Sequence, residues 1–121
     1  MLGFKLFGSG LSDLAVSAIG ADVGTGLTAT GSTQTGALAL VNCLNAVSTV
    51  ATGAGVLLYS GASAGDWQLV YNGGANALSV YPKSGAKINA LATNAAISLP
   101  VNTASIYFCM SSTLWVGILS A

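Results

Sequence analysis

Hydrophobic and polar residues alternate along most of the chain after residue 61. Regular alternation over four to eight residues is typical of half-buried strands. We predict strands over residues 67–72, 78–81, 96–99, 104–110 and 114–118. Turn-forming sequences fall between them, namely Asn72-Gly73-Gly74, Pro82-Lys83-Ser84-Gly85, Pro100 and Ser111-Ser112. The second half of the chain therefore indicates a succession of short strands and tight turns.

The segment from 24 to 61 shows a weaker form of the same pattern. Leu38, Leu40 and Asn42 follow a period of two, and Gly53 and Gly55 interrupt the chain before an apolar stretch. This pattern is typical of strands and turns, and it does not show the periodicity of a helix. The sequence at 37–40 faintly echoes the one at 77–80, but we find no convincing internal repeat.

Together these patterns predict an all-β fold. Short strands at this spacing favour a single antiparallel β-sandwich or barrel, jelly-roll-like, with about eight strands over residues 24–121. Long helical periods are missing, which argues against parallel β-α-β winding. A length of 121 residues suits one domain plus an arm.

Two predicted strands carry apolar residues on both of their faces. In 104–110, one face holds Ile106, Phe108 and Met110, and the other holds Ser105, Tyr107 and Cys109. In 67–72, Trp67, Leu69 and Tyr71 alternate with Gln68, Val70 and Asn72. We expect one face of each strand to pack in the core and the other to meet a neighbouring molecule. As core or interface anchors we predict Trp67, Tyr71, Phe108 and Trp115.

Residues 1–23 differ from the rest and form a predicted N-terminal arm. Phe4, Leu6 and Phe7 make an apolar cluster before the hinge Gly8-Ser9-Gly10. The segment 11–19 has the pattern of a short helix with Ser12 as its N-cap. This cluster has no place in the alternating strand pattern, so we expect it to contact another molecule.

Composition narrows the function classes. The chain is 53% hydrophobic and 5% charged, with a formal net charge of zero. No apolar window reaches the roughly 18 residues that a membrane span needs, and no export signal is evident. Three scattered Lys and no Arg argue against nucleic acid as a partner. A surface with so little charge predicts that much of it is buried against other subunits.

The residue types needed for most catalysis are missing. The chain has no His, no Glu and no Arg, and its three Asp are scattered. We therefore expect no enzymatic activity, no metal site and no cofactor. Cys43 and Cys109 lack the spacing of zinc or redox motifs, and both free thiols and a bridge between strands remain open.

Two short motif matches do not change this picture. Gly24-x-Gly26-x-x-Ala29 formally matches a dinucleotide fingerprint, but no helix pattern follows and no acidic residue lies about 20 residues on. We interpret its glycines as turn formers. Ser84-Gly85-Ala86-Lys87 matches the S-x-x-K string of serine β-lactamases, but it follows Pro82 in a turn rather than opening a helix.

The stretch from 68 to 116 resembles a recurrent module of tailed-bacteriophage virion proteins. The resemblance rests on turns and strand ends, namely Asn72, Gly74 to Asn76, Val80 to Pro82, Gly85 with Ile88 and Asn89, Asn94 to Ala96, Phe108 and Trp115. Upstream, 26–31 with Ala37 and Leu38 is similar to the same proteins. It implies a capsid decoration (cement) protein, which would form a homotrimer on the outer surface of the capsid after synthesis in the host cytoplasm.

On that resemblance, the partners would be the major capsid protein and further copies of this chain. Phe4, Leu6 and Phe7 would then be the capsid contacts. Comparable β-modules also occur in tail fibres, so a subunit of a tail fibre or receptor-binding protein is the alternative. The absence of long repeats and of a coiled-coil segment favours the cement protein.

Overall fold

The computed structural model describes residues 22–119, and that part of the chain contains ten strands and no helix. The all-β class is therefore confirmed. The strands are β1 (Val23–Thr28), β2 (Leu38–Ala39), β3 (Leu44–Thr49), β4 (Gly55–Leu57), β5 (Trp67–Asn72), β6 (Leu78–Tyr81), β7 (Lys87–Ile88), β8 (Ile97–Leu99), β9 (Ala104–Ser111) and β10 (Leu114–Leu119). The predicted arm and its short helix lie almost entirely outside the described residues.

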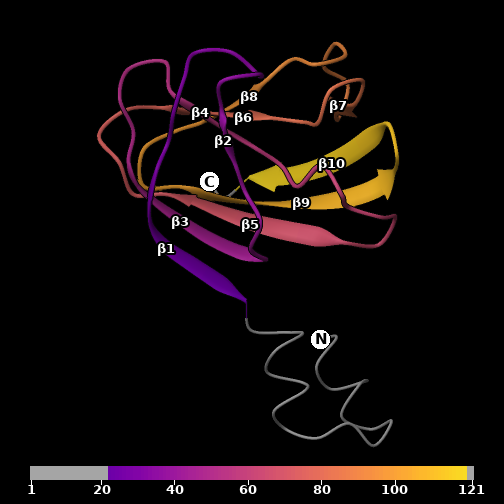
Figure 1. Ribbon diagram of the computed structural model, residues 1–121, viewed down its shortest axis with the longest axis horizontal. Helices are drawn as coiled ribbons and strands as arrows, with labels where there is room; N and C mark the ends of the chain where they lie inside the picture. Colours follow the sequence, from indigo (N-terminus) through magenta and orange to yellow (C-terminus); the bar gives the residue numbers. More distant parts are fainter. Residues whose placement is uncertain (1–21, 120–121) are drawn as a thin grey trace, which may run out of the picture.

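The strands form two sheets, one of six strands in the order β1-β3-β5-β9-β10-β7 and one of four in the order β2-β4-β6-β8. Figure 1 shows β1, β3, β5, β9 and β10 side by side, with β2, β4, β6 and β8 in a second layer. From β1 to β6 the chain alternates between the two sheets, and successive strands in each sheet are parallel. This winding is β-solenoid-like. After β6, strand β8 pairs antiparallel with β6, and β9 pairs antiparallel with both β5 and β10, whereas β10 pairs parallel with β7.

The predicted antiparallel pairing is therefore wrong for a large part of the fold, and neither a sandwich nor a barrel describes the arrangement clearly. Parallel neighbours need a long crossover connection, which is usually a helix. Here a strand in the opposite sheet makes each crossover, so parallel pairing arises without any helical segment. The antiparallel expectation holds for β5–β9, β9–β10 and β6–β8.

Buried amide side chains tie neighbouring coils together. Asn45 in β3 donates from Nδ2 to the carbonyl of Leu69, 24 positions later, at 3.1 Å. Asn76 donates from Nδ2 to the carbonyl of Val50, 26 positions earlier, at 2.8 Å. These bonds join the side chain of one coil to a backbone carbonyl of a neighbouring coil.

The core lies between the two sheets. The fully buried residues include Val47, Val70, Ile88, Tyr107 and Trp115 of the six-stranded sheet and Val56, Leu78, Val80 and Leu99 of the four-stranded sheet. In β5 and β9 the alternate residues point away from this core. The six-stranded sheet thus has an inner face that packs on the second sheet and an outer face that does not.

Candidate functional site

The outer face of the six-stranded sheet presents a group of apolar side chains that are open to contact. Its residues are half-buried or exposed, in contrast with the buried inner residues of the same strands. We call it the open face and define it by Val23, Leu44, Ala46, Trp67, Leu69, Tyr71, Ala104, Ile106, Phe108, Met110, Val116 and Ile118. None of these residues is charged.

Strand register makes the open face continuous. One row crosses five strands, because Val23 pairs with Leu44, Leu44 with Leu69, Leu69 with Ile106, and Ile106 with Ile118. Cross-strand partners share a face of a sheet and their side chains touch. The row is therefore a single apolar band across the sheet.

A second row beside it contains three large side chains. Trp67 pairs with Phe108, and Phe108 pairs with Val116. Met110 lies two positions beyond Phe108 in β9, on the same face of the sheet, and is 57% exposed. The open face thus combines aromatic and flexible apolar groups, which are enriched at the centres of protein interfaces.

A hollow of about 250 Å³ opens in the open face. Its lining residues are almost entirely apolar and come from β5, β9 and β10, namely Leu69, Ala104, Ser105, Ile106, Ile118 and Leu119. Ile118 stands at its rim and is 62% exposed. The hollow has room for an inserted apolar side chain.

The four predicted anchors divide between the two faces. Trp115 is 1% exposed and belongs to the core. Trp67, Tyr71 and Phe108 lie together on the open face, where Tyr71 is 40% and Phe108 37% exposed. The predicted capsid contacts Phe4, Leu6 and Phe7 lie outside the described residues.

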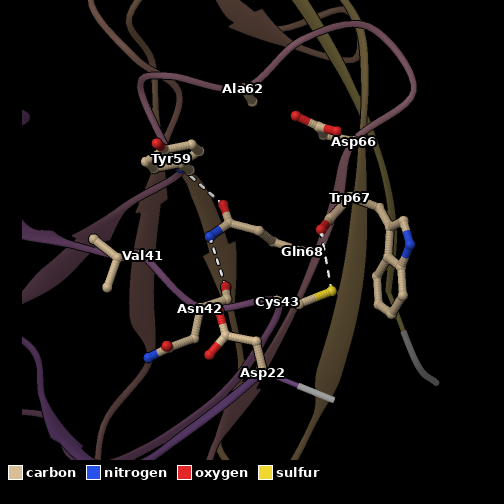
Figure 2. Close-up of a pocket in the computed structure, with 9 residues that line it drawn as sticks. All are labelled: Asp22, Val41, Asn42, Cys43, Tyr59, Ala62, Asp66, Trp67 and Gln68. Atoms are coloured by element: carbon tan, nitrogen blue, oxygen red, sulfur yellow. Dashed lines mark hydrogen bonds between the residues drawn. The ribbon is translucent and has the colours of Figure 1, made fainter. Parts of the chain in front are cut away.

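A second candidate is a cleft of about 260 Å³, lined by both polar and apolar residues, where the loop after β4 meets the segment that precedes β3 (Figure 2). Gln68 forms its floor. The Tyr59 backbone N–H donates to Gln68 Oε1 at 2.8 Å, and Gln68 Nε2 donates to the Asn42 carbonyl at 2.9 Å. Both ends of this amide are thus used to hold two chain segments together. The role of Gln68 was not predicted from the sequence, although a Gln that alternates with Trp67 and Leu69 in a predicted strand was a signal for it.

The cleft contains no activated thiol, and its one cysteine is Cys43. Burial, followed by the carboxylates of Asp22 and Asp66, raises the pKa of the Cys43 thiol, which keeps it protonated at neutral pH. Burial likewise raises the pKa of the Cys109 thiol. Both cysteines are free, which settles the question of a bridge between them. Among residues 22–119, no group of three or more His, Cys, Asp or Glu is placed to hold a metal ion.

The two motif matches fall in unremarkable places. Gly24 to Thr28 forms strand β1, and Gly26 has a φ of 64° where the register with β3 shifts. These glycines therefore mark an irregular strand rather than the turn we predicted. Lys87 of the second match is exposed and lies in β7, just after a turn.

No helix in the described part of the chain is long and apolar enough to cross a membrane. No family model matches the chain, and neither the curated proteins nor the solved structures include a significant match. The candidate site consequently rests on the geometry of this molecule alone, and the open face is the stronger of the two candidates.

Proposed function

We propose that this chain is a non-enzymatic virion protein that decorates and stabilises a tailed-phage head. It would bridge major capsid subunits on the outer surface of the capsid. The observation that carries the proposal is the open face, an uncharged apolar surface that crosses five strands. Such a surface fits a protein that functions by lasting contact with other subunits.

Two further features support this function. The chain lacks the His, Glu and Arg side chains on which most catalysis depends. Its described body is held by two packed sheets and by amide bonds between coils, as suits a particle exposed to the environment. We propose that it assembles as a homotrimer and that Phe4, Leu6 and Phe7 in the N-terminal arm contact the capsid.

The winding of the chain favours a second candidate, a subunit of a tail fibre or receptor-binding protein. Parallel coils, as in β1 to β6, stack along one axis and are suited to elongated assemblies. The two candidates place the protein on different parts of the virion.

Location in the virion tests the proposal. Antibodies raised against the purified protein should label heads in electron micrographs of virions from the phage that encodes it. Labelling confined to tails would favour the fibre candidate and contradict the cement function. Virions that carry no label, although the antibody detects the purified protein, would contradict both.

A further inference from the structure

We propose that the open face is the surface through which copies of this chain bind one another, with a second copy as its occupant. This deepens the self-association in the proposed function and rests on it. The surface involved is specified by strand register and exposure, independently of any capsid.

The first argument is the shape and extent of the surface. Five neighbouring strands about 4.8 Å apart and about 20 Å long present a flat area of about 500 Å². A standard protein interface takes about 800 Å² from each partner, counted with the relief of its side chains. As a flat area the open face is smaller than this, and it approaches the size of a standard interface once the relief of its side chains is counted.

The second argument is electrostatic. The charged residues of the described chain, Asp22, Asp66, Lys83 and Lys87, all lie outside the open face. A charged partner surface would lose its hydration against this face and gain no counter-charge in return. The same face of a second copy is equally uncharged, so neither partner would bury an unpaired charge.

The open face carries both a hollow and protruding side chains that could fill the hollow of a second copy. The hollow beside Ile106 lies on the same face as protruding side chains, of which Ile118 and Met110 are 62% and 57% exposed. In a pair of copies related by two-fold symmetry, a side chain of one copy that enters the hollow of its partner is matched by the reciprocal contact, whereas the contacts in a three-fold trimer are not reciprocal. Sheets pack face to face about 10 Å apart through such interdigitated side chains. The face thus carries both halves of the contact.

The test measures mass in solution by light scattering on the full-length chain at micromolar concentration. The wild type should contain more than one copy. Ile118→Lys should weaken association by about 100-fold or more and run as a monomer, because it places an unpaired charge in the interface. The matched control is Val41→Lys, which adds the same charge at a β-branched residue that is 68% exposed and outside the open face. It should keep the wild-type mass.

Met110→Lys provides a second disrupting variant at the other end of the face. Circular dichroism and thermal melts should show wild-type structure in all three variants, since each position is more than half exposed. A monomeric wild type, or unchanged mass in both Ile118→Lys and Met110→Lys, would overturn the proposal. Loss of association only when residues 1–21 are deleted would make the arm the occupant and would overturn it as well.

These outcomes separate this inference from the function proposed above. An assembly that forms through the open face but does not bind phage heads would contradict only the cement function. A dimer would contradict the homotrimer and support the interface.

Discussion

Tyr107 is a buried side chain whose protonation ties stability to pH. It is fully buried on the inner face of β9, and the hydroxyls of Tyr107 and Ser105 are hydrogen-bonded at 2.6 Å. Burial, opposed in part by that hydrogen bond, raises the pKa of Tyr107 from 10.0 to about 12. The folded state therefore favours the protonated phenol.

Stability should fall as pH rises from about 10 to about 12, because the unfolded chain releases the Tyr107 proton first in that window. Below pH 10 the contribution is fully present. The loss should be about 2 to 3 kcal/mol, measured by urea unfolding at a series of pH values. The double variant Tyr107→Phe with Ser105→Ala removes the titrating phenol together with its hydrogen-bond partner and should lose less stability across this window. Parallel losses in both proteins would contradict the prediction.

Trp115 and Trp67 provide a comparison between the two faces of the same sheet. Trp115 is 1% exposed in the core, whereas Trp67 is half-buried on the open face. Trp115→Ala should lower the free energy of unfolding by about 3 to 5 kcal/mol, since it leaves a large cavity. Trp67→Ala, measured by the same thermal melts in dilute solution, should cost clearly less. Equal effects would show that Trp67 also supports the fold of the single chain.

At the scale of elements, the strands with clean alternation were predicted well. β5 and β6 occur with the predicted bounds, and β9 and β10 are each one residue longer than predicted. Parallel pairing was missed because it depends on which distant segments become neighbours, and alternation within one strand is silent on that. The faint echo between 37–40 and 77–80 did fall on two strands of one sheet, β2 and β6. The two segments are not in equivalent positions. Leu38 pairs with Val56, and Val56 pairs with Val80, whereas the sequence similarity would match Leu38 with Leu78.

Packing between β9 and β10 depends on a glycine. Gly117 pairs with Tyr107, and a Cβ at Gly117 would lie 2.8 Å from Cε1 of the Tyr107 ring. The ring is fully buried and cannot move aside freely, so Gly117→Ala should destabilise the fold by about 1 to 3 kcal/mol.

Gly36→Ala is the matched control, because its Cβ would have no neighbour closer than 3.4 Å. Urea unfolding of both variants measures the difference. A Gly117→Ala protein as stable as Gly36→Ala would mean that the Tyr107 ring has room to shift.

For the whole molecule, the sequence predicted that strands such as 104–110 have two apolar faces, but it could not say which face is covered. The structure buries Ser105, Tyr107 and Cys109 and leaves Ile106, Phe108 and Met110 outside. Ile106, Phe108 and Met110 are the more apolar set, so hydrophobicity alone would have predicted that they are the buried residues. Gln68 and Asn72 are buried because their side chains donate hydrogen bonds to the carbonyls of Asn42 and Leu99, and those partners are in place only once the distant segments have packed together. Ser105 is buried because its hydroxyl is hydrogen-bonded to Tyr107 in the same strand.

The last prediction concerns the N-terminal arm, which we propose attaches the β body to the capsid. Deletion of residues 1–21 keeps Asp22, whose carbonyl accepts a hydrogen bond from the Leu44 N–H at 3.0 Å. The truncated chain should keep its β circular dichroism and melting temperature, because the described core draws on residues from 29 onward.

Occupancy on heads that lack this protein should fall sharply for the truncated chain. Each of Phe4, Leu6 and Phe7 buried in a groove of the shell would contribute roughly 1.5 to 3 kcal/mol, less the entropy of ordering the arm. A net gain of about 3 kcal/mol would raise affinity more than about a hundredfold. Replacing the three residues by Ser in the full chain should reproduce the loss while leaving the arm's length unchanged. If both proteins occupy heads as the wild type does, attachment does not use the arm, and the β body itself must supply the capsid contact.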